Sequence, residues 1–335
     1  MAYSIKDNPG LIKVLSLLKT HNTEYLSGQD LSDVLKISRV AVWKHIKKIK
    51  EMGYGVESIQ KQGYRLVSNT ELLLPWEITQ GLETTKVGKE VYYFDSIDST
   101  QDQAMKMASE IKNDGAVVIA QKQTGGKGRD GRRWISPKGG IWLSVILRPE
   151  FDISVATLFP IASALALAHT MEKCFDIKPE LKWPNDVTLK GKKVAGILVD
   201  ASLESNRIES IVLGVGINFD IDIKRVEKEL RGTPNFYGVA SLKKFKNSKS
   251  PVKFVQVFLA ELEKILELLN SGQIKKITKE WTKRSSTIGT NVELATREGK
   301  IIGKALRIDS DGALVISGKK STRVLAGDIA HLSSK

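Results

Sequence analysis

Residues 123–134 read QTGGKGRDGRRW, a glycine-rich segment that carries four cationic side chains. No hydrophobic core requires this composition, and the glycines let the backbone approach a ligand closely or adopt positive φ. The cations favour an anionic guest, either a phosphate or a carboxylate. Trp134 ends the segment with a flat ring that can stack on a base. The chain must therefore fold so that it presents this loop to a ligand.

One known nucleotide-binding loop has the same glycine spacing as this segment. Gly126, Gly128 and Gly131 have the G-x-G-x-x-G spacing of a dinucleotide fingerprint, which requires a strand before it and an apolar helix after it. Residues 116–120 (AVVIA) provide the strand, but a basic turn and a second strand-like run follow. This argues against a Rossmann loop, and the lack of G-x-x-x-x-G-K-[ST] excludes a Walker A loop. A solvated basic hairpin loop stays open as an alternative.

Length, charge and cysteine content limit the class of protein. The 335 residues predict two or three domains with a sizeable core. A net charge of +14 favours polyanionic partners, nucleic acid or nucleotide, or else serves solubility alone. Cys174 is the single cysteine, and the four histidines lack metal-ligand spacing, so neither a disulfide framework nor a resident metal site is predicted. The chain has no signal-peptide pattern, and its longest apolar run, 158–168, is too short for a bilayer, which predicts a cytoplasmic protein without a membrane partner.

Residues 1–66 contain three short helical patterns and then an alternating hairpin pattern. Ser27 and Ser38 are placed to cap the second and third helices. A helix-turn-helix at about 28–47 followed by a hairpin predicts a winged helix DNA-binding domain. The candidate DNA contacts on the basic third helix are Arg39, Trp43, Lys44 and Lys47. A three-helix interaction module, whose lysines only solvate it, is the alternative.

The rest of the chain divides into three further segments. Residues 67–80 are expected to form a linker, because Pro75 breaks the periodicity. In residues 81–272 strand-like runs alternate with helical patterns, which predicts a mixed, mainly antiparallel sheet with helices on one side. Residues 273–335 contain closely spaced short strands joined by hairpin turns, which predict a small β-barrel. The fold class is therefore α+β and multidomain.

Polar clusters follow the predicted strands of the central segment. They are DSTQ (98–101), KWPND (182–186), Lys193 before an apolar strand, and GVGIN (214–218). Each has a purely structural explanation: a helix cap, a Trp-Pro corner, a surface charge or a strand end. Their repeated position at strand ends indicates one shared binding site.

These motifs, in this order around the loop 123–134, resemble the biotin–protein ligases. With the N-terminal winged helix, the chain resembles the bifunctional form that is also the biotin operon repressor. The likeness covers nearly the whole chain, and it implies an SH3-like fold for the C-terminal barrel. Asp130 departs from the family loop, which often has a cation or a neutral residue there, and Lys127 stands where arginine is frequent.

The resemblance implies a two-step reaction. Biotin and ATP, with Mg²⁺, form biotinyl-5′-adenylate, and biotin then passes to a lysine of a biotin carboxyl carrier protein. The implied biotin-binding residues are Ser99, Thr100, Gln101, Gln123, Lys127, Gly128, Arg129 and Lys193. The implied ATP- and adenylate-binding residues are Arg129, Arg132, Trp134, Lys182, Lys193 and Asn218, and the implied catalytic residues are Lys193, Arg129 and Asp186.

The resemblance also implies regulation. The adenylate acts as corepressor, promotes a homodimer and raises affinity for operator DNA. Two other functions stay open. One is a lipoate-type ligase on the same fold, and the other is a non-catalytic, ligand-sensing DNA-binding repressor.

Overall fold

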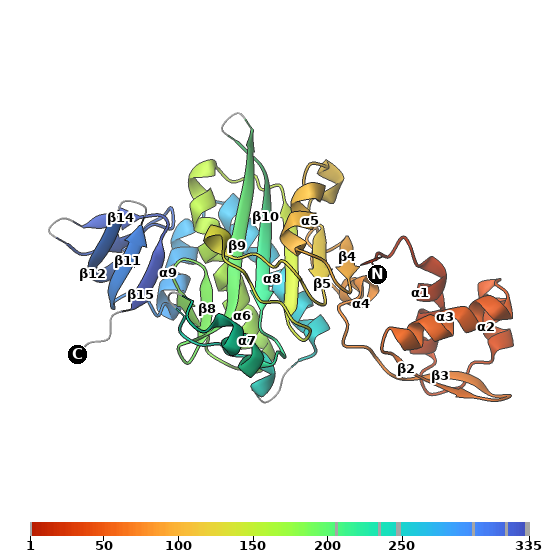
Figure 1. Ribbon diagram of the computed structural model, residues 1–335. Coiled ribbons are helices and arrows are strands. Elements are labelled where there is room, and N and C mark those ends of the chain that lie inside the picture. Colours follow the sequence, from red (N-terminus) through yellow and green to blue (C-terminus); the bar gives the residue numbers. More distant parts are fainter. Residues whose placement is uncertain are drawn as a thin grey trace.

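A computed structural model describes residues 2–204, 207–233, 236–245, 249–296, 299–318 and 321–331. The chain runs from a helical part at one end, through a large central sheet, to a small sheet at the other end (Figure 1). This order agrees with the predicted α+β, multidomain organisation.

The N-terminal part consists of three helices and a two-stranded hairpin. Ser27 caps the second helix in a capping box with Asp30, and Ser38 Oγ accepts a hydrogen bond from the Ala41 amide at 3.2 Å. Both predicted caps are confirmed. The elements are α1 (Pro9–Thr20), α2 (Gly28–Leu35), α3 (Arg39–Glu51), β2 (Gly55–Ile59) and β3 (Gly63–Ser68).

The central sheet has eight strands in the order β1-β4-β5-β6-β10-β9-β8-β7. β4 and β5 pair in parallel and the other neighbours pair antiparallel, so the prediction of a mixed, mainly antiparallel sheet is confirmed. The strands are β1 (Ala2–Tyr3), β4 (Val91–Phe94), β5 (Val117–Ala120), β6 (Ile141–Leu147), β7 (Glu180–Lys182), β8 (Asp186–Leu189), β9 (Lys192–Glu204) and β10 (Arg207–Ile217).

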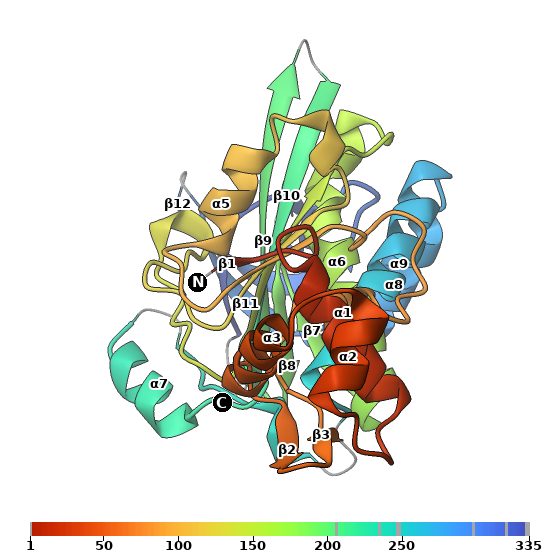
Figure 2. The same ribbon diagram turned by 90° about the vertical axis from the view of Figure 1, so that its right-hand side faces the viewer.

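Helices cover both faces of this sheet, which corrects the expectation that they lie on one side. α6 (Phe159–Phe175) and α8 (Pro251–Asn270) pack on one face, and α5 (Thr100–Met107) lies on the opposite face (Figure 2). Ala104 of α5 packs with Val118, Ile146 and Val212, whereas the alternate strand residues join the main core. Every residue of β5 and β6 is buried, which requires cover on both faces.

One helical segment among the described residues, Ile153–Phe175, is apolar and long enough to cross a membrane. It contains α6, and 61% of its apolar window is buried inside the protein. Its apolar surface packs against α8 and the sheet, so α6 is accounted for as the central core helix.

The segment expected to be a linker, 67–80, contains a short buried helix, α4 (Pro75–Thr79). Trp76 of α4 packs edge to face against Tyr3, whose ring also stacks on Tyr93 at 6.0 Å. Tyr3 belongs to β1, which adds to the sheet beside β4 before the chain enters the helix-turn-helix. The N-terminal and central parts are therefore joined by packed aromatic side chains as well as by the chain.

The C-terminal part is a five-stranded antiparallel sheet that follows α9 (Ile274–Arg284). Trp183 links it to the central part, because its Nε1 donates to the carbonyl oxygen of Gly312 at 3.1 Å. The helix α7 and the five strands of this C-terminal sheet complete the fold. The remaining bounds are α7 (Ile223–Leu230), β11 (Asn291–Thr296), β12 (Gly299–Ile308), β13 (Leu314–Ile316), β14 (Thr322–Val324) and β15 (Asp328–His331).

Candidate active site

A pocket of about 380 Å³ opens between the 123–134 loop, the ends of β9 and β10, and α7. Every ligand-binding and catalytic residue predicted from the sequence lines it. These are Ser99, Thr100, Gln101, Gln123, Lys127, Gly128, Arg129, Arg132, Trp134, Lys182, Asp186, Lys193 and Asn218. The polar clusters that are scattered along the chain thus meet at one place, as predicted.

One end of the pocket is built on the N-terminus of α5. Ser99 caps the helix, and its Oγ accepts a hydrogen bond from the Asp102 amide at 3.3 Å. Thr100 donates twice to Gln123 Oε1, from its backbone amide at 2.8 Å and from its hydroxyl at 3.1 Å. Gln123 Nε2 in turn donates to Ser136 Oγ at 2.8 Å. The cap of α5 and Gln123 therefore form a fixed array of polar groups that lines this end of the pocket.

Gln101 and Ser144 extend this array into the core. Gln101 Nε2 donates to Asp200 Oδ2 at 2.8 Å and to the carbonyl oxygen of Val212 at 3.0 Å. Ser144 Oγ donates to Gln101 Oε1 at 2.9 Å and lies 3.0 Å from the Thr100 hydroxyl. Because the side chains of Thr100, Gln101 and Ser144 are all buried, these bonds hold them in one arrangement before any ligand arrives.

Glycines on β9 and β10 leave room for Trp134. A Cβ atom on Gly216 would lie 2.5 Å from Trp134 Cε2, and one on Gly196 would lie 2.8 Å from Trp134 Cζ3. Carbon atoms rarely approach closer than about 3.5 Å, so only glycine permits this contact. Trp134 Nε1 is buried and has no hydrogen-bond partner among the described residues. The indole therefore lies against the sheet at the pocket wall.

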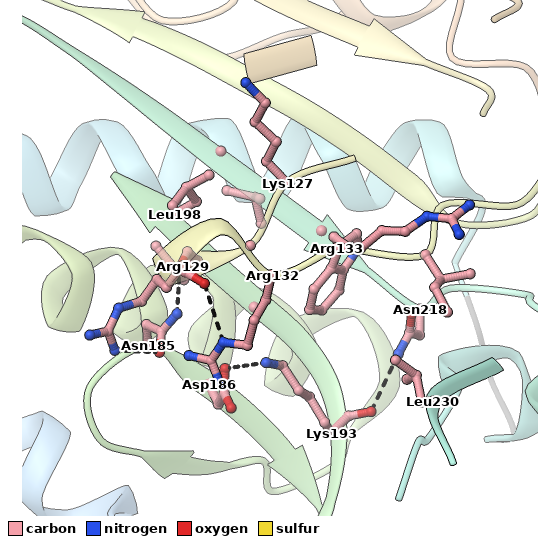
Figure 3. A pocket seen from close by; sticks show the side chains of 18 of the residues that line it. Lys127, Arg129, Arg132, Arg133, Asn185, Asp186, Lys193, Leu198, Asn218 and Leu230 are labelled. Carbon is pink, nitrogen blue, oxygen red and sulfur yellow. Dashed lines mark hydrogen bonds and ion pairs between the residues drawn. The ribbon is translucent and has the colours of Figure 1, made fainter. Parts of the chain in front are cut away.

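The cationic loop makes a tight turn above the strands. Asp130 and Gly131 both have left-handed backbone, with φ of 54° and 70°. Aspartate tolerates this conformation better than most residues, which gives a structural reason for Asp130 in the loop. Arg129 Nη1 donates to Asn185 Oδ1 at 3.3 Å, and Arg132 Nε donates to the carbonyl oxygen of Arg129 at 3.2 Å (Figure 3). Both guanidinium groups are thereby held on the KWPND side of the pocket.

Lys127 points away from the other cations in Figure 3. Its Nζ forms an ion pair with Asp102 Oδ1 at 2.6 Å, in the first turn of α5. This hydrogen bond raises the pKa of Lys127 above its ordinary value. In this structure Lys127 therefore reaches the α5 end of the pocket, and its predicted contact with a ligand carboxylate stays a prediction.

Asp186 and Lys193 form the charged centre of the pocket. Lys193 Nζ lies 2.6 Å from Asp186 Oδ1 and 5.0 Å from the centroid of the Trp134 ring. Asn218 Nδ2 donates to the carbonyl oxygen of Lys193 at 3.3 Å, which fixes the strand that carries the lysine (Figure 3). A carboxylate, an ammonium group and an indole face thus lie together at the strand ends.

Two family models match this chain. The Biotin/lipoate A/B protein ligase family matches residues 93–218, and an HTH domain matches residues 11–65. Bifunctional ligase/repressor BirA of Bacillus spizizenii is 34% identical over 94% of this chain and 97% of its own length. The chain belongs to the bifunctional ligase/repressor family. The Escherichia coli member is 31% identical over 93% of this chain and 94% of its own length.

Solved structures agree with this family at the level of the fold. A biotin protein ligase from Aquifex aeolicus, in complex with biotin and ATP, superimposes with a TM-score of 0.60 at 24% identity. The match covers 73% of this chain and 99% of that one. The matched fold is that of a biotin protein ligase, with a mixed sheet and helices.

The helix-turn-helix presents its four predicted DNA contacts to solvent. Arg39, Trp43, Lys44 and Lys47 are all exposed on α3, and 54% of the surface of residue Trp43 is accessible to solvent. Lys47 Nζ lies 5.8 Å from the centroid of that ring. The opposite side of α3 is buried, so these side chains lie on the exposed face of the helix, and their contacts with DNA stay a prediction.

Sequence reasoning missed several pocket residues. Ser144 is the polar residue within the apolar run 141–147, and that isolated hydroxyl was the available signal. Tyr237 donates its hydroxyl to Asp186 Oδ2 at 2.5 Å, but no motif surrounds it in the sequence. Burial raises the pKa of Tyr237, and the charge of Asp186 raises it further, so the phenol stays a donor.

Proposed function

We propose that this chain activates biotin with ATP and transfers it to a carrier protein. A biotin carboxylate oxygen attacks the α-phosphorus of ATP, forming biotinyl-5′-adenylate and releasing pyrophosphate. A lysine amine of a biotin carboxyl carrier protein then attacks the acyl carbon, loses its proton and displaces AMP. One observation carries this proposal: a pocket that joins a buried polar array to a cationic loop and the Lys193–Asp186 pair.

The buried array is suited to biotin. The ureido ring has N–H donors and a carbonyl acceptor, and the fixed hydroxyl and amide groups on α5 can pair with both. Because these groups already hold one another, little ordering remains to be done on binding. The proposed biotin contacts are Ser99, Thr100, Gln101 and Gln123, with Lys127, Gly128, Arg129 and Lys193 toward the carboxylate.

The cationic end is suited to ATP. Two anions, the biotin carboxylate and the α-phosphate, must meet there, so positioning and charge stabilisation dominate the chemistry. Trp134 and Asn218 contact adenine, whereas Arg129, Arg132 and Lys182 lie along the phosphates. Lys193 stabilises the charge that develops on the reacting oxygens.

Mg²⁺ would accompany ATP, and the carboxylates of the pocket permit this. Mg²⁺ usually takes one or two carboxylates, phosphate oxygens and several waters. Asp186 and Glu229 are the carboxylates among the described lining residues. Asp186 already binds Lys193 and Tyr237, so a metal ion would share that carboxylate with them. Asp186 therefore either helps to hold Mg²⁺ or receives the acceptor lysine.

The repressor function uses the N-terminal part. The adenylate acts as corepressor, favours a homodimer, and so raises affinity for a two-fold-symmetric operator. The protein works in the cytoplasm. This proposal includes the domain limits 1–66, 67–80, 81–272 and 273–335, with an SH3-like barrel as the last domain.

Exchange of radiolabelled pyrophosphate into ATP tests the ligase. We expect exchange that depends on biotin and is absent with lipoate. Exchange with lipoate alone would identify a lipoate-type ligase, and no exchange with either would identify a non-catalytic sensor. Incorporation of biotin into a carrier protein, and its loss when the acceptor lysine becomes arginine, tests the second step.

Sedimentation and operator titration test the repressor. Both are carried out with and without biotin plus ATP. We expect the ligands to shift the protein toward the dimer and to strengthen DNA binding. Equal dimerisation and equal affinity in both conditions would leave a ligase with an uncoupled helix-turn-helix.

A further inference from the structure

Tyr237 contacts two charged groups of the pocket, Asp186 and Lys182, although it belongs to none of the sequence motifs of the site. Its hydroxyl donates to Asp186 Oδ2 at 2.5 Å, while the other oxygen of that carboxylate binds Lys193 Nζ at 2.6 Å. Lys182 Nζ lies 3.6 Å from the centroid of its ring, well within cation–π distance. One side chain therefore connects both charged ends of the KWPND motif with the lysine of β9.

The backbone beside Tyr237 is tied to the strand of Lys193. The Lys193 amide donates to the carbonyl oxygen of Gly238 at 3.0 Å, and the Ala240 amide donates to that of Lys193 at 2.8 Å. Gly238 has a φ of 93°, which places a sharp bend directly after the tyrosine. Val239 is buried against Trp142. The ring of Tyr237 is thereby directed from an anchored segment toward Asp186.

The surroundings explain why the orientation of Asp186 matters. Arg129, Arg132, Lys182 and Lys193 all line this pocket, so Asp186 lies among like-charged cations. A carboxylate that rotated freely would not keep one oxygen directed at Lys193. A hydrogen bond from Tyr237 to Oδ2 leaves Oδ1 for Lys193 and fixes the ammonium group 5.0 Å from the centroid of the Trp134 ring.

We propose that Tyr237 is a positioning residue of the ligase site, which acts through Asp186 to place Lys193 and through its ring to hold Lys182. This inference rests on the proposed function, since it assigns Tyr237 to the adenylation step. The tyrosine itself transfers no proton and forms no bond to substrate. Its contribution is the geometry of two cations around the reacting oxygens.

Two substitutions separate the hydroxyl from the ring. Tyr237→Phe removes the hydroxyl alone and keeps the packing, and Tyr237→Leu also removes the ring beneath Lys182. The rate of adenylate formation is measured as pyrophosphate release in a single turnover with saturating biotin and ATP. We expect Tyr237→Phe to be slower by about tenfold, because a hydrogen bond to a charged group is lost, and Tyr237→Leu to be slower still.

Tyr25→Phe is the matched control. Tyr25 also donates its hydroxyl to a carboxylate, Glu57 Oε2, at 2.7 Å, but in the helix-turn-helix part of the chain. The same atom is removed and a tyrosine–carboxylate hydrogen bond is lost, but far from the pocket, so adenylation should keep its rate. The biotin affinity of Tyr237→Phe, measured by calorimetry, should stay within about twofold of that of the unmodified protein. Such binding would also show that the variant is folded.

A double-mutant cycle identifies the route of the effect. If Tyr237 acts through Asp186, the variant Asp186→Asn with Tyr237→Phe should be no slower than Asp186→Asn alone. A wild-type rate in Tyr237→Phe, rate losses that multiply in the double variant, or equal losses in biotin affinity and rate would overturn the inference. If the unmodified protein shows no biotin-dependent pyrophosphate exchange, the proposed function itself fails, and this result is distinct from the others.

Discussion

Two glycines on one face of β10 offer a way to perturb the two ends of the pocket separately. Gly214 and Gly216 are two residues apart, so an added methyl group points to the same side of the sheet at both positions. Neither has positive φ, so alanine fits the backbone of both. A Cβ on Gly214 would lie 2.5 Å from Gln101 Oε1, whereas one on Gly216 would lie 2.5 Å from Trp134 Cε2.

The cost of each substitution follows from these distances. A carbon–carbon contact is most favourable at about 3.5–4.0 Å, so Gly216→Ala must move the indole by about 1 Å. Overpacking of this kind costs about 1–3 kcal/mol. If the cost falls on ATP binding, affinity drops roughly 5- to 160-fold. Gly214→Ala displaces Gln101 Oε1 and breaks its bond with Ser144, which costs about 1–3 kcal/mol on the biotin side.

Adenylate formation at varied ATP gives the KM for ATP, and calorimetry without ATP gives the Kd for biotin. We expect Gly216→Ala to raise mainly the first constant and Gly214→Ala mainly the second. Gly28→Ala is the control, because its Cβ would meet nothing closer than Tyr64 Cε2 at 3.7 Å and its φ is ordinary. An unchanged KM for ATP in Gly216→Ala, or equal effects of both substitutions on both constants, would refute the division of the pocket.

Lys193→Ala should slow adenylation by about 10²–10³ with little change in thermal unfolding; a normal rate would make Lys193 an ordinary surface charge. Arg129→Ala loses a charge-assisted donor worth about 1.5–3 kcal/mol, so the adenylate should dissociate faster in a chase experiment, and an unchanged rate would contradict its role. Lys47→Ala should lower the salt slope of operator binding by about one per half-site, and an unaltered slope would remove it from the phosphate contacts. Burial lowers the pKa of His169, and the Arg284 charge lowers it further. The stability that the neutral His169 side chain contributes is complete above the unfolded-state pKa of about 6.5, and it is lost as pH falls through the lower folded-state pKa. The free energy of unfolding in urea should therefore fall less between these pH values in His169→Gln than in the unmodified protein.

The residues that line the pocket could be predicted from the sequence because most of them are polar or charged and occur in short motifs. The glycines and cations of 123–134, the KWPND motif and Lys193 lie at strand ends, and strand ends on one side of a sheet meet. The caps Ser27 and Ser38 were predictable for a similar reason, since a cap is a local interaction.

Long-range packing was not predictable in this way. β1 has two residues and α4 has five, which is too few for a hydrophobic period to appear. The position of α5 on the opposite face depends on small residues such as Ala104, which mark no face by themselves. Tyr237 reaches Asp186 because the backbone that follows it pairs with the strand of Lys193. No sequence pattern around Tyr237 indicates that pairing.

The segment 67–80 was expected to be a linker, but its helix α4 is bonded to both the helix-turn-helix part and the central part. Glu77 accepts hydrogen bonds from Lys19 Nζ at 2.6 Å and from the Tyr54 hydroxyl at 2.5 Å, both in the helix-turn-helix part. On its other side, Gln256 Nε2 of α8 donates to the carbonyl oxygens of Glu77 and Ile78. A flexible linker would let the recognition helix adopt many orientations, whereas these bonds hold it in one. In the proposed dimer, the spacing of the two recognition helices would then depend on how the central parts pair, and that pairing is what a ligand in the pocket can influence.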